Sequence, residues 1–346
     1  MKKILFAAAV VLAGSLSCQA QVTTDPVGFV SVTVPAASDA AVGVPLGLAS
    51  EFQGVIQSIS GNTITMAGTP GWTASQFLYV APVGSAASTQ PKTYYIRIDS
   101  GVREGLIATI TANDASSVTI TVPNGDDLTG VLTNAANGTG DSISIAPYWT
   151  LATLITGVPA GTKVLLYPTN TTTTIPGYPA NQSGINIAGT AYTYTGTNWK
   201  NGSFTGDDTI LPAYQGFTVR NNSAAAITIS ITGSVPMSTS RMVLRTLSSN
   251  TSQDQRIFFN SPVPELLSST NLGLTPGDSV LTIDNTATGQ NKAGNKITWT
   301  GTQWRQGNND VTSTYMLQPG TSYILRKIST ATPGNSISTH LQSYLQ

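Results

Sequence analysis

One thirteen-residue block occurs twice in this chain, and this repetition constrains the fold more than any other sequence feature. The block AYTYTGTNWKNGS at 191–203 returns as KITWTGTQWRQGN at 296–308. Two further blocks repeat around it in the same order. VPAGTKVLLY matches LTPGDSVLTI, and LPAYQGFTVRNNS matches LQPGTSYILRKIS, which aligns Arg220 with Arg326. Three matched blocks in one order indicate two copies of a single folding unit.

Short alternating segments fill most of the remaining sequence. GFVSVTV, TYYIRI, SVTITV, KVLLY and SYILRK are rich in Val, Ile, Thr and Tyr and are bounded by Gly, Pro, Asn or Asp, which is typical of strands. SISGNTITM predicts a hairpin that turns at Gly61-Asn62. Helical periodicity is nearly absent, and only 264–270 and the tail 337–345 suggest short helical turns. The sequence therefore predicts an all-β fold.

The first copy of the unit is interrupted. A strand followed by a polar loop with an aspartate occurs near Asp39 and again near Asp254, and only the first is followed by an excess of about 95 residues. We therefore expect two related β-sandwich-like repeat units, with a small β-barrel-like domain inserted in the first. The expected segments are 21–50 plus 147–235 for the first unit, 51–146 for the inserted domain, 236–335 for the second unit and 336–346 for a C-terminal tail.

A domain inserted into a surface loop requires that its two ends lie close together. We therefore expect Glu51 and Pro147 to be neighbours in the fold.

The first twenty residues, MKKILFAAAVVLAGSLSCQA, have the pattern of a signal peptide. Lys2 and Lys3 precede an apolar stretch and a small-residue cleavage site. The apolar stretch is too short for a membrane-spanning helix, so we expect export and no transmembrane segment after signal removal. A lipidated Cys18 is the alternative, although Ser15 stands where such signals carry a branched apolar residue. Signal removal also removes the only cysteine, which excludes a disulfide or a thiolate metal site.

The charge balance bears on the class of partner. The chain has 16 basic and 16 acidic residues, and loss of Lys2 and Lys3 leaves 14 against 16, a net charge of −2. Such a chain has no basic surface for nucleic acid. Only 9% of the residues are charged, while Thr, Ser, Asn and Gly are abundant, as in many extracellular β proteins. We expect a periplasmic, secreted or cell-surface location.

The aromatic residues of the repeated block allow two interpretations. Tyr192 and Tyr194 point to one side of a strand, Gly196 lies in the turn, and Trp199 returns on the next strand, with Trp304 at the equivalent position of the second copy. These rings either fill the core of a hairpin or offer a stacking platform for a sugar. Trp199 and Trp304 are thus the candidate contacts for a ligand or partner. Two further candidate platforms are Trp72 and Trp149.

Residues with catalytic chemistry are scarce. The single histidine, His340, lies in the predicted polar tail, and no G-x-S-x-G motif supplies a nucleophile. Glycoside hydrolysis would need two carboxylates, but there are only three glutamates, and aspartates such as Asp126-Asp127 in PNGDDLTG occupy turn sequences. No metal or cofactor motif is present. The sequence predicts a non-enzymatic protein without a cofactor or a metal site.

Several segments resemble an uncharacterised family of secreted bacterial β-rich proteins. They are the DPVGFV-type start at 25–30, YYIRIDSGVREG, GDSISIAPYWTLATLI and LQPGTSYILRK. The resemblance covers essentially the whole mature chain and is most specific at 25–30 and 320–327. It implies export and offers no catalytic residues to carry over.

These observations predict an exported, non-enzymatic β protein with a structural or interaction role at the cell envelope or outside the cell. Exposed strand edges would serve self-association or the binding of other envelope proteins. The alternative is an extracellular carbohydrate-binding module for a polysaccharide. The burial of Trp199 and Trp304 distinguishes the two hypotheses, because a stacking platform must be open to solvent.

Overall fold

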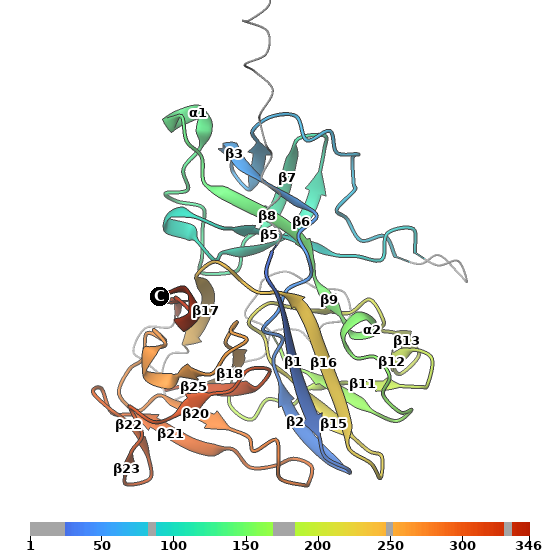
Figure 1. Cartoon of the computed structure of the whole chain (residues 1–346), viewed down its shortest axis with the longest axis vertical. Helices are drawn as coiled ribbons and strands as arrows, with labels where there is room; N and C mark the ends of the chain where they lie inside the picture. The colour runs from blue at the N-terminus through green and yellow to red at the C-terminus, as the bar shows by residue number, and fades with distance from the viewer. Residues whose placement is uncertain (1–24, 82–87, 169–183, 247–251, 329–333) are drawn as a thin grey trace, which may run out of the picture.

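The computed structural model describes residues 25–81, 88–168, 184–246, 252–328 and 334–346 (Figure 1). Strands make up 44% of the structure and helices 5%, so the all-β prediction is confirmed. The predicted signal peptide, 1–20, lies outside the described residues. Within the described ranges, no helix has the length and apolarity needed to cross a membrane.

The first unit combines a six-stranded antiparallel sheet with a two-stranded ribbon. The ribbon pairs β1 (Val27–Val34) with β16 (Ile227–Ser234), and a smaller pair joins β9 (Trp149–Thr150) to β14 (Ile210–Leu211) beside the short helix α2 (Leu151–Leu154). The six-stranded sheet has the order β13 (Phe204–Thr205), β12 (Trp199–Asn201), β11 (Thr190–Tyr194), β10 (Lys163–Leu166), β15 (Phe217–Asn221) and β2 (Ser38–Val42).

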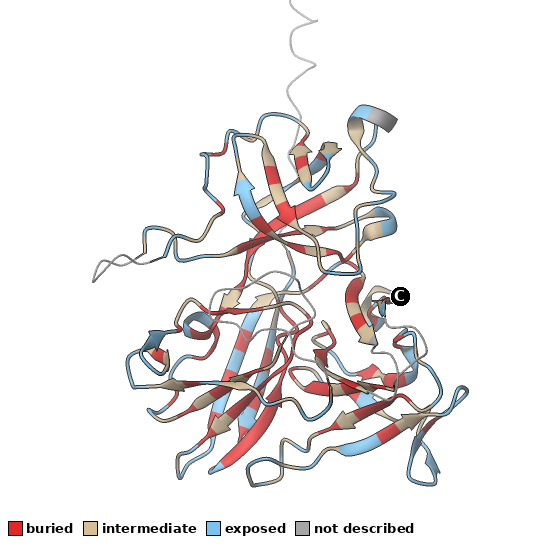
Figure 2. Cartoon of the chain, turned by 180° about the vertical axis from the view of Figure 1, so that it is seen from behind, coloured by how far each residue is buried: buried red, intermediate tan, exposed pale blue. Residues whose placement is uncertain are grey.

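The period-two alternation in the sequence produces the core of this unit. Val30, Val32 and Val34 of β1 point inward while the residues between them are exposed, because successive side chains of a strand point to opposite faces. Figure 2 shows the same alternation of buried and exposed positions along the strands. The six-stranded sheet contributes the facing residues, among them Val164 and Phe217. Ribbon and sheet therefore enclose one apolar core.

The second unit has the same strand order. A ribbon pairs β17 (Ser240–Thr246) with β26 (Gly334–His340), and a smaller pair joins β19 (Glu265–Leu266) to β24 (Met316–Leu317), next to the 3-10 helix η2 (Leu267–Ser269). Its six-stranded sheet runs β23 (Asn309–Asp310), β22 (Trp304–Gln306), β21 (Asn295–Trp299), β20 (Ser279–Thr282), β25 (Ser322–Lys327) and β18 (Gln253–Phe258). Each strand of the second unit therefore has a counterpart in the first, which defines equivalent positions in the two units.

A closed six-stranded barrel occupies the segment between β2 and β9. Its strands, in order around the barrel, are β3 (Phe52–Ser60), β4 (Thr63–Met66), β7 (Ser117–Thr121), β6 (Ile107–Asn113), β5 (Tyr94–Ile98) and β8 (Ser142–Pro147). The 3-10 helix η1 (Gly101–Arg103) and helix α1 (Asn134–Asn137) lie in its connections. β3 and β4 join at Gly61-Asn62, as predicted. The barrel encloses a core separate from those of the two units.

The barrel enters and leaves the first unit at one place. The Glu51 amide donates to the Ile145 carbonyl oxygen at 2.8 Å, and Tyr94 pairs with Pro147 on the neighbouring strand. Glu51 and the end of β8 are therefore neighbours, as expected for the two ends of an inserted domain.

A buried ion cluster fastens the barrel to the second unit. Asp126, in the barrel connection after β7, accepts from Arg241 of β17 at 2.6 and 2.9 Å and from Arg103 at 3.3 Å. Close beside it, a Cβ on Gly105 would lie 1.9 Å from the Thr239 carbonyl oxygen, and Gly105 has φ +85°, so glycine is required there. The barrel is docked on the second unit as well as inserted in the first.

The two units contact each other reciprocally. Val42 forms an isolated bridge with Thr321, and at the equivalent positions Ile257 forms one with Gln215. The interaction therefore follows an approximate two-fold relation, in which each unit uses the same surface.

The prediction of a C-terminal tail at 336–346 was wrong. Residues 334–340 form β26, which pairs along its whole length with β17, and Gln342 is buried. Only the 3-10 helix η3 (Ser343–Leu345) follows. Polar residues misled the prediction, because Ser338 and His340 are buried in the second unit although their neighbours are polar.

Candidate functional site

The tryptophans of the repeated block are core residues. Trp199 is 1% exposed and Trp304 is 2% exposed. Each faces the aromatic ring directly across its hairpin, Tyr194 at 5.3 Å and Trp299 at 5.4 Å between ring centroids. Neither tryptophan offers a face to a sugar or to a partner. The repeated block fills two equivalent hairpins.

The two other candidate platforms are also engaged in packing. Trp72 is buried in the barrel, where its ring makes edge contacts with Phe52 and Phe77. Trp149 packs against the core of the first unit, and its indole N–H donates to the Leu46 carbonyl oxygen at 2.8 Å. All four candidate tryptophans therefore stabilise the fold.

His340 lies in a buried polar cluster instead of a mobile tail. It is 3% exposed, and its Nε2 lies 3.7 Å from Oε2 of Glu265 without a hydrogen-bond partner. Oε1 of Glu265 accepts from the hydroxyls of Ser261 and Ser343 at 2.9 and 3.0 Å. The carboxylate is thus held by its serine donors, and no serine hydroxyl bonds to the imidazole among the described residues. Sequence reasoning missed this cluster because its members come from distant segments.

The burial of His340 predicts a dependence of stability on pH. Desolvation lowers the pKa of His340 below its usual value, against the attraction of Glu265, so the unfolded chain binds this proton more readily than the folded one. The free energy of unfolding should therefore fall as the pH decreases through about 6.5, by up to about 1.4 kcal/mol per pH unit from this group. Urea unfolding at several pH values between 5 and 8 gives the free energy of unfolding at each pH. For His340→Gln this free energy should change less steeply with pH than for the wild type. Leu341→Gln, an exposed neighbour, should keep the wild-type slope, and equal slopes for wild type and His340→Gln would contradict the assignment.

Five charged side chains line a cavity between the two units, namely Asp39, Arg220, Asp254, Arg256 and Lys292. A cavity of about 450 Å³ opens between the six-stranded sheets. Both units line it with equivalent residues, which are the pairs Asp39 and Asp254, Leu165 and Leu281, Asn186 and Asn291, Ala188 and Ala293, and Gly189 and Gly294. We refer to this cavity as the inter-unit cleft.

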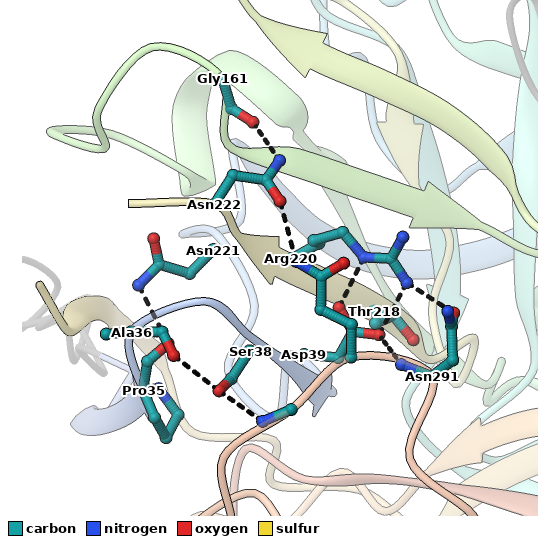
Figure 3. Close-up of polar contacts among 12 residues, drawn as sticks. Pro35, Ala36, Ser38, Asp39, Gly161, Thr218, Arg220, Asn221, Asn222 and Asn291 are labelled. Atoms are coloured by element: carbon teal, nitrogen blue, oxygen red, sulfur yellow. Dashed lines mark hydrogen bonds and ion pairs between the residues drawn. The ribbon is translucent and has the colours of Figure 1, made fainter. Parts of the chain in front are cut away.

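An ion pair of the first unit forms one wall of the cleft, and a loop of the second unit completes it. Arg220 donates from Nε and Nη2 to the two carboxylate oxygens of Asp39 at 2.7 and 2.8 Å, and from Nη2 to Oδ1 of Asn291 at 2.6 Å (Figure 3). The Asn291 amide donates to Asp39 at 2.7 Å. The hydrogen bonds with Asp39 raise the pKa of Arg220. Through Asn291, this ion pair links the units.

The opposite wall repeats this arrangement with the units exchanged. Arg326 donates to Asp254 at 2.7 and 2.8 Å and to Asn186 of the first unit at 3.1 Å, and the Asn186 amide donates to Asp254 at 2.8 Å. Asn186 and Asn291 have φ of +53° and +51°, a region that asparagine tolerates better than most residues. Each unit therefore inserts one loop into the ion pair of the other.

The cleft departs from this symmetry at four positions. The second unit places Arg256, Lys292 and two isoleucines where the first has Ala41, Ile187, Tyr167 and Thr218. The equivalent pairs are Ala41 with Arg256, Ile187 with Lys292, Tyr167 with Ile283, and Thr218 with Ile324. The cleft therefore has cations on the side of the second unit and hydroxyl groups on the side of the first.

The cleft contains groups for binding rather than for metal coordination. Across the described residues, no group of three or more His, Cys, Asp or Glu is placed to hold a metal ion. Asp39 and Asp254 have their carboxylate oxygens engaged by arginine and by backbone amides. Arg256 and Lys292 are the lining cations that form no ion pair among the described residues.

Comparisons with family models, with curated proteins and with solved structures found no match for this chain.

Proposed function

We propose that this chain is an exported, non-enzymatic β protein with an interaction role at the cell envelope or outside the cell. The signal-like segment 1–20 and the low content of charged residues support export. The buried ion clusters support a scaffold role, because Asp126, Asp39 and Asp254 each join two parts of the chain. In this proposal the three parts form one rigid body that presents a binding surface.

The open edge of β1 is the observation that carries the proposal. β1 pairs with β16 along one edge over eight residues, Val27↔Ser234 to Val34↔Ile227. Among the described residues, no backbone group outside β16 hydrogen-bonds to the backbone of Val27–Val34. An eight-residue edge with unpaired amides and carbonyls is a template for an added strand.

The equivalent edge in the second unit is closed. The Gln255 side chain accepts from the Arg245 amide at 3.1 Å and donates to the Val243 carbonyl oxygen at 2.8 Å, so it occupies the outer edge of β17. Ala40 stands at the equivalent position beside β1 and has no group for this role. One ribbon is thus capped by a side chain, and the other is left available.

The outward face of β1 carries two exposed apolar side chains. Val27 is 74% exposed and Phe29 is 64% exposed, and they stand two residues apart on the same side of the strand. A strand that adds to this edge would place its own side chains beside them, which would supply an apolar contact in addition to backbone hydrogen bonds. We propose a partner strand from a second copy of this chain or from another envelope protein.

The alternative role, a carbohydrate-binding module, depended on exposed tryptophans. Trp199 and Trp304 are buried, and Trp72 and Trp149 are packed. No observation at these residues favours polysaccharide binding, so we retain the interaction role.

Cross-linking in the cells that export the protein tests this role. We expect the wild-type chain to give cross-linked products larger than the monomer in the envelope or extracellular fraction. Phe29→Lys should reduce them, because a lysine on an edge strand opposes strand addition. The free energy of unfolding should change by less than about 0.5 kcal/mol, as for most surface substitutions.

Val102→Lys is the matched control, because Val102 is 67% exposed on η1, far in sequence from β1. It should leave the cross-linked products unchanged. Recovery of the wild-type protein as a soluble monomer without cross-linked products would refute the proposed role, as would equal cross-linking of wild type and Phe29→Lys.

A further inference from the structure

The inter-unit cleft contains a cation, Arg256, that forms no ion pair among the described residues. Arg256 extends from β18 over the ring of Tyr167, with its guanidinium carbon 4.2 Å from the ring centroid. Its Nη2 donates to the Tyr167 hydroxyl at 3.2 Å, while Nη1 is buried and has no acceptor in the described part of the chain. The two aspartates of the cleft are engaged with Arg220 and Arg326. The cation–π contact and the hydrogen bond thus hold the guanidinium over the Tyr167 ring and leave the Nη1 donor unused.

Lys292 adds a second cation on the same side. Its Nζ donates to the carbonyl oxygens of Asp284 and Ala287 at 2.5 and 2.9 Å, and it forms no ion pair within the described residues. Two of its three N–H donors are therefore used on neutral acceptors. These bonds position the ammonium group at the cleft without compensating its charge.

The charges around the cleft do not balance. Of the lining residues, Asp39 and Asp254 supply two negative charges and Arg220, Arg256 and Lys292 supply three positive charges, while Arg326, which pairs with Asp254, adds a fourth. Asp284 lies near Lys292 but is exposed and accepts hydrogen bonds from Thr286. Desolvation is the main cause that lowers the pKa of both Arg256 and Lys292. A bound anion would offset this desolvation.

The rest of the lining determines what accompanies the anionic group. Apolar side chains from both units cover much of the cleft, and these are Leu165, Ile187, Leu281, Ile283 and Ile324. The cavity of about 450 Å³ is within the size range of pockets for small molecules. A ligand that uses the whole cleft therefore combines an anionic head with an apolar body.

We propose that the inter-unit cleft binds a small carboxylic acid with an aliphatic or aromatic body, whose carboxylate accepts hydrogen bonds from Arg256 while Lys292 supplies the second positive charge. Arginine matches a carboxylate in shape and donor spacing. This site is distinct from the β1 edge, so it does not depend on the proposed interaction role.

Titration of the full-length mature protein with hexanoate and with hexanamide tests the proposal. The two probes share size and apolar body and differ in charge. Isothermal titration calorimetry should show saturable binding of hexanoate with a stoichiometry of one, and binding of hexanamide weaker by about tenfold or more, as expected for the loss of a charge-assisted hydrogen bond. Inorganic phosphate, which lacks the apolar body, should bind more weakly than hexanoate.

Two variants locate the site. Arg256→Met keeps an unbranched side chain and removes the charge, and Lys292→Ile introduces the residue type that the first unit has at the equivalent position, Ile187. Each should weaken hexanoate binding by about tenfold or more and leave hexanamide binding unchanged. Arg305→Gln removes an exposed positive charge on β22 and should bind hexanoate like the wild type. Circular dichroism checks that each variant is folded, and Lys292→Ile keeps the test valid if Arg256→Met does not fold.

Three results would overturn the proposal. They are equal affinities for hexanoate and hexanamide, unchanged hexanoate affinity in a folded Arg256→Met or Lys292→Ile variant, and the absence of saturable hexanoate binding. Phosphate that binds as tightly as hexanoate would show that the cleft recognises the anion alone, which would overturn the assignment of an apolar body.

Discussion

Asp126→Asn is expected to destabilise the protein by about 3–5 kcal/mol, because it leaves the buried guanidinium of Arg241 without its counter-charge. The Asp126 side chain is 2% exposed and the Arg241 side chain 7%. Arg103 also loses a partner. Since this cluster joins the barrel to the second unit, the substitution should also separate the unfolding of these two parts. Urea unfolding followed by circular dichroism measures the loss.

The adjacent residue provides a matched control. Asp127 carries the same side chain and also contacts Arg103, but it is 61% exposed. An exposed ion pair contributes about 0–1 kcal/mol, so Asp127→Asn should change the free energy of unfolding by no more than that. Similar losses for Asp126→Asn and Asp127→Asn would show that the barrel is not held by the buried pair.

Trp199→Ala and Trp304→Ala are each expected to cost about 3–5 kcal/mol, the usual loss when a large buried aromatic side chain is truncated. Both residues are buried against an aromatic partner, Tyr194 and Trp299 respectively. Because they belong to separate cores, each substitution should act first on its own unit. Thermal unfolding monitored by calorimetry would resolve the affected transition.

Phe204, which is 57% exposed on β13 next to Trp199 on β12, is the control for this pair. Phe204→Ala should change stability by less than about 0.5 kcal/mol. If Trp199→Ala and Trp304→Ala left stability unchanged and abolished binding to a polysaccharide, the stacking interpretation would replace the structural one.

Local sequence patterns predicted the local structure well. The alternation in GFVSVTV places Val30, Val32 and Val34 in the core, and Gly61-Asn62 turns the first barrel hairpin as expected. These features depend on neighbouring residues, so one sequence is enough to predict them. The short alternating segments also predicted the all-β class, since no long apolar period of 3.6 competes with them.

Contacts between distant segments were harder to predict. Asp126 was interpreted as a turn residue because it stands next to glycine and a second aspartate, yet it forms a buried ion cluster with Arg241. His340 was assigned to a tail because its neighbours are polar, and burial by the second unit reversed that assignment. Arg241 is 115 residues from Asp126, and Glu265 is 75 residues from His340, so a local sequence pattern cannot predict either contact.

One signal of the cleft was present in the sequence. The repeat alignment matched Asp39 with Asp254 and Arg220 with Arg326, and opposite charges retained at equivalent positions of two copies suggest an ion pair. Asn186 of the first unit bonds to Asp254 of the second, and Asn291 of the second unit bonds to Asp39 of the first. These contacts could not be inferred, because they depend on how the two units pack. Likewise, only the packing of the units shows that Arg256 and Lys292 line the same cleft.

The two ends of the barrel segment lie side by side, so the barrel is a cassette, meaning a domain inserted at a single point of the first unit. Because the Glu51 amide bonds to Ile145, a direct connection across these ends would leave the first unit with the same uninterrupted strand order as the second. The cassette is nonetheless not freely removable, since Arg241 depends on it for Asp126. Deletion of the cassette is therefore expected to leave Arg241 of the second unit without its carboxylate partner, Asp126.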